Sequence, residues 1–474
     1  MKKKYVRWTL WTIASPFILF VILCILIYLP PIQNFLVDKA AVYASEATGM
    51  NISVGRISLS FPLNLVVTDV DAASPHNDTL LSVRRLQVNV QLLPLLKKQV
   101  EVDGISLQGA TVNSNDLIHG MKLNGTLGEL FISSHGVALD PETAIVNKVL
   151  LKDTDLSLCL NDTAAVDTAA SDTTYWKIIL QDIDLQNVSF ALDMPLDSLS
   201  LAASLDNAIL RDGLIDLHKS AYSLQTFRIK NGRVRYDSGK PLAADSLPSG
   251  LDPSHIALTD IGVKLDSLYY EGRNMKAIIS QFVLKERSGV EIVSATGRMV
   301  SNDKVLRVPS LKLETRDSYL ELNAAMDWNA LDFKGEGLVS ARLMADIGKP
   351  DVVRFMGRMD EKFVRQYPSE PLRIRTGIDG DLNKLKLTTL TAELPGALGL
   401  FARGELTHLT DSLLRGGDIT LEAETKDLKF VSTLAEGIEI PYGTRLEGKF
   451  TMAGAKMGTD LLLMQPEAQA VAAA

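Results

Sequence analysis

Acidic side chains recur in closely spaced pairs along this chain, and paired carboxylates are the residues that acid–base catalysis or calcium binding would use. The pairs are Asp69 with Asp71, Asp153 with Asp155, Asp182 with Asp184, and Asp379 with Asp381. Each pair lies in a strand-like segment or at a turn, where a carboxylate commonly accepts hydrogen bonds from backbone N–H groups. The glycine spacing of an EF-hand loop is missing. We therefore interpret these residues as solvated or turn acids rather than as a catalytic or calcium site.

Histidine and cysteine are too few and too scattered to indicate another kind of site. The chain has 6 histidines, none paired at helical spacing, and 2 cysteines, Cys24 and Cys159. No nucleophile elbow, H-E-x-x-H metal motif, phosphate-binding P-loop or dinucleotide-binding glycine motif is present in the sequence. The sequence therefore predicts a protein that is not an enzyme and that has no metal site and no cofactor.

Composition narrows the class further. The 474 residues include 49 basic and 57 acidic side chains, for a net charge of −8, and 46% are hydrophobic. This balance is typical of a folded protein rather than a disordered one. An acidic chain with no block of Lys and Arg beyond its N-terminus argues against a nucleic-acid partner.

The first 30 residues predict a membrane anchor. Four basic residues, at positions 2, 3, 4 and 7, precede an uncharged stretch from Trp8 to Leu29, which is long enough to cross a bilayer as a helix. The anchor residues are Trp8, Trp11, Phe17, Phe20 and Tyr28. The basic flank favours a cytoplasmic N-terminus, so we expect a single-pass inner-membrane protein with the bulk of the chain in the periplasm. A cleaved signal peptide is the alternative, but the apolar run is longer than a usual h-region.

Two further segments follow the anchor. Residues 31–49 predict a short amphipathic helix that ends near Gly49. From residue 50 onward the apolar period changes to two, which is typical of strands with one apolar face. Ile57 to Val67 alternates as if it were one strand, Leu86 to Leu92 does so again, and residues 71–78 are expected to form the turn between them.

A short motif recurs in this strand-rich region: apolar, any, apolar, any, Gly/Asn/Asp, then a small or apolar residue, any, apolar. The central Gly, Asp or Asn falls at Gly109, Asp153, Asn187, Asn231 and Asp260. We interpret each copy as a strand, a tight turn or bulge at the central residue, and then the next strand. Irregular repeats of this kind indicate an elongated array of about 20–25 strands, each burying apolar surface against its neighbours.

A larger repeat of about 78 residues is visible later in the chain. The leucine-rich segment 311–322 resembles segment 390–400. A helix is expected from Asp351 to about Arg365, because its apolar residues follow helical spacing, and a shorter counterpart is expected near Leu428 to Leu434. The segments 161–172 and 237–254 are expected to be loops.

The stretch from Gly55 to Asn113 closely resembles the N-terminal region of the AsmA-like, TamB-type (translocation and assembly module) family of Gram-negative bacteria. The residues that carry the resemblance are Ile57-Ser58-Leu59, Pro62-Leu63-Asn64-Leu65, Asp78-Thr79-Leu80-Leu81-Ser82, Arg85-Leu86-Gln87-Val88, Leu92-Leu93-Pro94-Leu95-Leu96 and Val102-Asp103-Gly104-Ile105-Ser106-Leu107. The single anchor and the helix after it also match, and residues 390–406 resemble the family's interior repeats.

This resemblance implies a mainly β fold, in which an N-terminal transmembrane helix precedes an elongated repeating β-groove made of a curved antiparallel sheet with a few short helices. It implies that residues 50–474 form this periplasmic groove. Members of the family usually continue into a C-terminal β domain, so we expect this groove to be incomplete at its C-terminus. The resemblance also implies a role in outer membrane biogenesis, through lipid transport or through assembly of outer-membrane proteins and protein secretion with an Omp85-type barrel partner.

A one-sided apolar sheet predicts where such a protein would bind lipid. Acyl chains need no hydrogen bonds, so a continuous apolar lining is sufficient and no catalytic residue is required. The groove-lining residues that we predict are Ile57, Leu59, Phe61, Leu63, Leu65, Leu86, Val88, Val90, Ile105 and Leu107. Conduction of phospholipid acyl chains and a scaffold for outer-membrane protein insertion both fit this lining, and the sequence does not decide between them.

Overall fold

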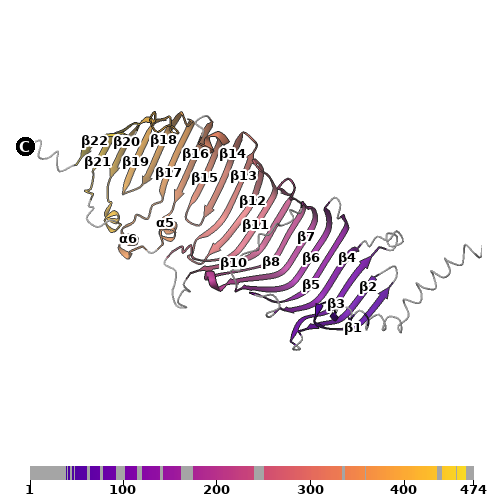
Figure 1. The fold of residues 1–474 in the computed structure, drawn as a ribbon. Helices are drawn as coiled ribbons and strands as arrows, with labels where there is room; N and C mark the ends of the chain where they lie inside the picture. The colour runs from indigo at the N-terminus through magenta and orange to yellow at the C-terminus, as the bar shows by residue number, and fades with distance from the viewer. Residues whose placement is uncertain are drawn as a thin grey trace, which may run out of the picture. The chain divides into compact units, whose positions relative to one another are not determined.

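The computed structural model shows a mainly β protein (Figure 1). It describes residues 39, 41–42, 45–46, 48–60, 64–74, 78–91, 102–114, 120–138, 142–161, 175–239, 250–333, 337–357, 359–434, 440–454 and 456–465. Its 22 strands are hydrogen-bonded into one sheet, which agrees with the strand array expected from the sequence. The chain divides into two compact units, residues 1–209 and 210–474.

The first unit contains the strands up to the beginning of β8. Their bounds are β1 Asn51–Ser60, β2 Asn64–Ala73, β3 Thr79–Val90, β4 Val102–Asn113, β5 Met121–Ala138, β6 Thr143–Leu160, β7 Lys177–Met194 and β8 Leu199–Asp216. A 3-10 helix, η1 Pro195–Asp197, precedes β8. Strands β1 to β6 pair antiparallel in sequence order. Strands β6 and β7 are parallel, so the expectation of a wholly antiparallel sheet is wrong at this pair.

The second unit contains the remaining strands. Their bounds are β9 Ala221–Leu224, β10 Thr226–Ser238, β11 His255–Glu271, β12 Asn274–Glu286, β13 Glu291–Ser301, β14 Val305–Thr315, β15 Tyr319–Asp327, β16 Leu338–Ile347, β17 Leu372–Asp381, β18 Lys384–Leu394, β19 Leu398–Thr407, β20 Gly416–Thr425, β21 Arg445–Ala453 and β22 Lys456–Met464. From β10 to β22 each strand pairs antiparallel with the next. The similar leucine-rich segments 311–322 and 390–400 lie at corresponding places in the hairpins β14–β15 and β18–β19.

The N-terminal predictions lie mostly outside the described residues. The anchor and its aromatic residues are all outside them, and no described helix has the length and apolarity needed to cross a bilayer. The described helical residues before β1 end at Gly49, whose φ of 69° and whose N–H, donated to Ser45 O, are typical of a helix C-terminus. The described helical residues therefore end beside Gly49, where the sequence predicted the end of a helix.

Two predictions about elements need correction. The alternating run 57–67 is not one strand: β1 and β2 are separate, antiparallel strands with Leu59 opposite Leu65. The helix expected over 351–365 is two helices, α5 Lys349–Met356 and α6 Glu361–Gln366. Gly357 ends α5 with a φ of 75°, a conformation that glycine adopts without a steric penalty.

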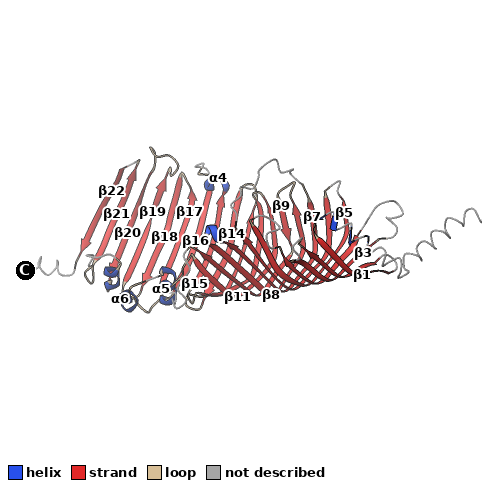
Figure 2. Cartoon of the chain, turned by 60° about the horizontal axis from the view of Figure 1, so that its bottom comes forward, coloured by secondary structure: helices blue, strands red, loops and turns tan. Residues whose placement is uncertain are grey.

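Helices α5 and α6 lie at one end of the strands of the second unit. Phe363 of α6, Tyr367 and Phe430 pack their rings 5.1–5.8 Å apart, and Phe363 is only 1% exposed. Phe430 belongs to η2 Lys429–Thr433, the 3-10 helix found where a shorter counterpart helix was expected. Figure 2 shows α5 and α6 at this end and α4 Trp328–Leu331 at the opposite end. The cluster formed by Phe363, Tyr367 and Phe430 is a conventional hydrophobic core.

A row of kinked residues crosses the first unit, and we call it the crease. It consists of Gly55, Asp69, Arg84, Gly109, Gly128, Asp153 and Asn187, which face one another from β1 to β7 where the ladders skip one pair. Asp69, Gly109, Asp153 and Asn187 have φ between 49° and 62°, in the left-handed region. Gly109, Asp153 and Asn187 are central residues of the sequence motif, and each lies inside a single strand. The motif therefore marks a kink within one strand. The prediction that the chain turns into the next strand at the central residue is wrong.

Candidate functional site

Strand register places apolar residues of β1–β7 in rows that run across the strands. Facing partners in a sheet share a face, so each row forms a continuous strip. The first row is Leu59, Leu65, Val88, Ile105, Ile132, Val149 and Ile183. The second row is Ile57, Val67, Leu86, Leu107, Leu130, Leu151 and Leu185. All of these residues belong to the first unit.

Two more rows lie beyond the crease. The third is Val54, Val70, Val83, Ala110, Leu127, Thr154 and Val188. The fourth is Ile52, Ala72, Leu81, Val112, Gly125, Leu156 and Phe190. In β2, β4, β6 and β7 a left-handed residue interrupts the strict alternation of side chains, so apolar positions at −4 and −2 from the crease and at +1 and +3 after it keep to one face. The residues of β1, β3 and β5 join the same rows through their register with these strands. We call these four rows the apolar face.

The apolar face is not covered as a core would be. Most of its side chains are half-buried, and Ile105 and Phe190 are each 37% exposed. Within the described part of residues 1–209, the buried apolar residues are only Ala72, Leu80, Val83 and Ala208. An apolar surface of this extent on a folded protein marks a place where something apolar binds.

The opposite face is mostly polar, although Val66, Phe131 and Leu150 also lie on it. The row next to the crease on that side is Arg56, Thr68, Arg85, Gln108, Glu129, Lys152 and Gln186. Asp69, Asp153 and Asn187 of the crease are exposed. A sheet that is apolar on one side and charged on the other can bind an apolar ligand on the first side while water solvates the second.

The structure brings together most of the groove-lining residues predicted from the sequence. Ile57, Leu65, Leu86 and Leu107 fall in or beside the first two rows with Leu59, Val88 and Ile105, although they come from four strands. Val90 ends β3 and pairs with Val102 only after a shift in register. Phe61 and Leu63 lie outside the described residues.

Sequence reasoning missed the contributions of β5, β6 and β7 and both rows beyond the crease. The sequence motif contained the information needed to find these rows. The four apolar positions of each copy in β4, β6 and β7 are the residues that those strands contribute to the four rows. Two unnoticed copies surround Asp69 in β2 and Asp212 in β8, which has a φ of 50°. With these copies the motif occurs in five of the strands β1 to β8 rather than in three, and its copies in β2, β4, β6 and β7 contribute residues to all four rows.

The paired acids serve strand and turn geometry. Asp153 accepts a hydrogen bond from Asn187 Nδ2 at 2.9 Å, and Asp155 accepts one from Ser189 Oγ at 2.8 Å, both across the parallel pair β6–β7. Asp381 caps a turn by accepting from the backbone N–H of the residues at 383 and 384. Among the described residues, no group of three or more metal-binding side chains comes together.

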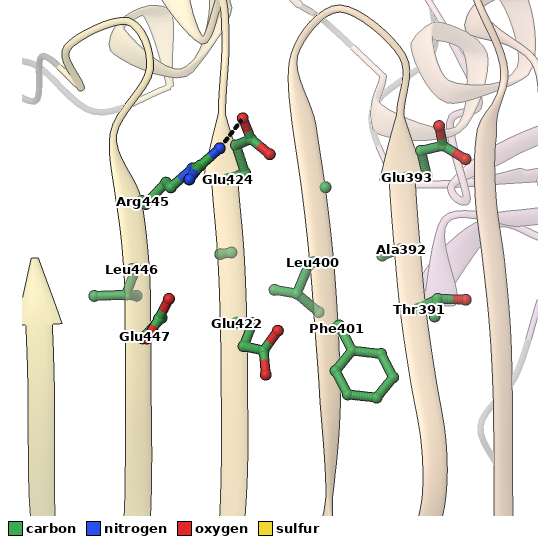
Figure 3. A pocket seen from close by; sticks show the side chains of 12 residues that line it. Thr391, Ala392, Glu393, Leu400, Phe401, Glu422, Glu424, Arg445, Leu446 and Glu447 are labelled. Atoms are coloured by element: carbon green, nitrogen blue, oxygen red, sulfur yellow. Dashed lines mark ion pairs between the residues drawn. The ribbon is translucent and has the colours of Figure 1, made fainter. Parts of the chain in front are cut away.

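A shallow hollow of about 490 Å³ crosses β18–β21 in the second unit (Figure 3). It opens beside Gly399, where an added Cβ would meet nothing within 4 Å. Glu393, Glu424 and Arg445 line it with side chains that are 51–62% exposed, and Arg445 Nη2 lies 3.5 Å from Glu424 Oε1. Exposed carboxylates in an open hollow lack the burial that usually tunes an acid–base pair, so we do not assign a site here.

Ion pairing adds a local electrostatic feature to the second unit. Lys285 Nζ lies 2.8 Å from Asp260 Oδ2, and this hydrogen bond lowers the pKa of the Asp260 carboxyl and raises that of the Lys285 ammonium. Asp260 is the left-handed motif residue of β11. The pair lies on an exposed surface, where such contacts stabilise little.

Neither protein-family models nor curated proteins match the chain.

Proposed function

We propose that this protein is an inner-membrane-anchored periplasmic β-groove protein that binds phospholipid acyl chains on its apolar face and conducts them toward the outer membrane. The observation that carries the proposal is the apolar face itself: four registered rows across seven strands that no described element covers. Acyl chains satisfy such a surface because they bring no hydrogen-bonding groups that would be left unpaired.

The test is the lipid content of the purified protein. The full chain, extracted from membranes and washed, should retain phospholipid that mass spectrometry identifies. A variant with Leu107→Asp and Leu130→Asp on the apolar face should retain much less, whereas Gln108→Asp and Thr126→Asp on the polar face should not change it. Equal lipid content in the two folded variants would contradict the proposal.

The membrane topology is part of the same proposal. A reporter that is active only in the periplasm should work when it is fused after Val100, because the basic N-terminal flank favours the cytoplasm. Activity of a cytoplasmic reporter at that position would overturn the orientation.

A scaffold of a translocation and assembly module is the second candidate, and the edge strand β22 favours it. Leu461, Leu462 and Leu463 are 52–57% exposed, and β21 is the described neighbour of this strand. An exposed strand with apolar residues on both faces can accept a strand from another protein. If an Omp85-type barrel protein binds there, Leu462→Lys should abolish the binding and leave the lipid content unchanged.

A further inference from the structure

Four connections of the second unit lie along one line. They join β15 to β16, β17 to β18, β19 to β20 and β21 to β22, and they share one end of the sheet because each of these strands is antiparallel to the next. The strand ends are in register there, from Leu338 opposite Asp381 to Ala453 opposite Lys456. Figure 2 shows α4 at this end, opposite α5 and α6. We call this line the turn rim; its described residues are 327–333, 337–338, 382–384, 408–415, 454 and 456–457.

The turn rim leaves large apolar side chains in solvent. Its five most exposed apolar residues are 62–85% exposed: Phe333, Leu338, Leu413, Leu414 and Met457. Single exposed apolar residues are common on proteins, but several of them gathered along one border mark a surface that binds something apolar. Phe333 and Met457 are separated by about six strand spacings, or about 29 Å.

Hydrogen bonds join neighbouring turns of the rim, so a fixed backbone presents these side chains. Leu409 N–H donates to Leu382 O at 2.8 Å, and Gly454 N–H donates to Arg415 O at 2.6 Å. Other apolar residues at this end of the strands pack into a small core, which contains Ala330, Val339 and Leu382 with Leu385 and Leu409 against them. The turns therefore bury some of their apolar residues and leave the five exposed ones outside.

The backbone N–H groups of the exposed leucines are already paired. Asp411 Oδ1 accepts hydrogen bonds from the N–H groups of Leu413 at 2.8 Å and Leu414 at 3.2 Å. Asp327 Oδ2 accepts one from Leu338 N–H at 3.1 Å. Because these N–H groups are paired within the turns, the turns can enter a less polar medium without leaving them unsatisfied.

Phe333 has an unusual backbone conformation for a bulky residue. Its φ is 54°, in the left-handed region, which residues with a Cβ adopt at a cost. Its N–H donates to Ala330 O at 3.1 Å, at the end of α4. Residues held in such conformations cluster at functional sites, and this one leaves its ring 74% exposed.

The charges of the turn rim fit a phospholipid surface. The acidic side chains of its described residues are engaged within the protein: Asp327 and Asp411 accept from turn N–H groups, and Asp332 Oδ2 lies 2.9 Å from Arg273 Nη2. Lys456 is exposed at the same end of the strands. An exposed ammonium group can pair with lipid phosphate, and carboxylates that are already paired oppose that contact less.

We infer that the turn rim docks on the surface of a phospholipid bilayer, with Phe333, Leu413 and Leu414 inserted among the headgroups and the upper acyl chains. A protein partner would need a separate pocket for each projecting turn, whereas a bilayer accepts apolar side chains along any line that meets its surface. This docking is additional to the proposed binding of acyl chains by the first unit and does not depend on it.

Quenching by brominated lipids tests the docking. The full chain is reconstituted in vesicles of phosphatidylethanolamine and phosphatidylglycerol that carry bromine on their acyl chains. A fluorescent amino acid replaces Phe333 or Leu413 on the turn rim, or Phe355 or Tyr442 at the other end of the strands, where these two residues are 55% and 72% exposed. We expect quenching of the two rim labels and not of the two control labels. Equal quenching at both ends would overturn the inference, because lipid held on the sheet itself would reach both. Absence of quenching at the rim would also overturn it and would leave these turns to a protein partner.

Variants test whether the turns insert together. With the label at position 333, Leu413→Asp combined with Leu414→Asp removes two inserted side chains from a different turn, so the ratio of docked to free protein should fall at least about tenfold. Phe355→Asp combined with Tyr442→Asp is the matched control and should leave the ratio unchanged. Phospholipid retained by the washed protein, which reports the apolar face, should be the same in both variants. Unchanged quenching at position 333 in the Leu413 and Leu414 variant, with normal hydrogen exchange in β19–β21, would overturn the inference.

Discussion

The first two rows of β1–β7 carry a large apolar residue on every strand, whereas one row of β16–β22 alternates small and large residues from β16 to β21. That row is Ala345, Ile374, Ala392, Leu400, Ala423, Leu446 and Leu463. The two regions also differ in backbone: β1–β7 share the crease, whereas in β12 to β22 the described non-glycine residues with positive φ, Phe333 and His408, lie in connections and not in strands.

Stability is distributed differently in the two regions. The second unit has an aromatic core under α6 and η2, and cross-strand ion pairs such as Arg375 with Asp346 at 2.8 Å. The first unit has few buried apolar residues among those described and keeps large side chains half-exposed. The second unit therefore buries apolar residues in its own packing, whereas the first leaves them half-exposed, as the proposed binding of acyl chains requires.

The largest expected effect breaks the core of the second unit. Phe363→Ala should destabilise this unit by about 3–5 kcal/mol, because it removes a fully buried ring from the aromatic cluster. Leu130→Ala on the half-exposed apolar face should cost only about 1 kcal/mol. Hydrogen exchange of β17–β19 and of β4–β6, measured separately, checks both values. Equal costs at the two sites would remove the distinction between the regions.

A charge on the apolar face should have the next largest effect. Val88→Asp places a carboxylate against acyl chains, which costs several kcal/mol if the chains stay in contact with it, so bound phospholipid should fall at least about tenfold. Asn89→Asp, on the polar face of the same strand, should change little. Circular dichroism and protease resistance confirm that each variant is folded. Normal lipid binding by folded Val88→Asp would favour the scaffold over the lipid groove.

The sequence predicted the type of fold and part of the site for identifiable reasons. Alternation with period two specified the strands, and Ile105 and Leu107 share a face in the structure, as alternation in a strand predicts. The kink at Asp69 was missed because the residue types that adopt a left-handed backbone within a strand, Asp, Asn and Gly, are also the types that are typical of turns. The break at Gly357 was missed because helical spacing of apolar residues continues across it.

The parallel pairing of β6 with β7 was also not predicted. A parallel pair requires a long connection, and the chain between Leu160 and Lys177 is long enough to supply one. Residues 161–172 of this connection were predicted to form a loop, but the length of the connection was not used to predict the direction of the next strand. The rows beyond the crease depend on register across seven strands, which local periodicity does not specify.

A smaller effect is expected from the left-handed residues themselves. Asp69→Val should destabilise the first unit by about 1–2 kcal/mol, because a β-branched residue disfavours the left-handed conformation. Asp69→Gly should be close to neutral, since glycine adopts that conformation freely. Urea unfolding monitored by hydrogen exchange in β1–β3 measures both. A valine variant as stable as the glycine variant would show that the backbone conformation at this position carries no cost.

The smallest effect is a pH dependence near the start of β11. A hydrogen bond with His255 lowers the pKa of the Asp252 carboxyl below 3.8. A depressed carboxyl pKa contributes stability that is present above the unfolded-state pKa and is lost as the pH falls through the folded-state pKa. Protection of the His255 backbone N–H, which donates to Asp252 O at 3.0 Å, should therefore decrease below about pH 4. Asp252→Asn should remove this decrease; an unchanged pH profile in that variant would assign it to another group.

Photo-crosslinking from the two faces of the same strands tests the central claim most directly. A photoreactive amino acid is placed at Leu59 or Val88 on the apolar face, and at Ser58 or Asn89 on the opposite face, in the full chain expressed in cells. The account predicts phospholipid adducts from Leu59 and Val88 and none from Ser58 and Asn89. Equal capture of phospholipid from both faces, with all four proteins folded, would contradict it.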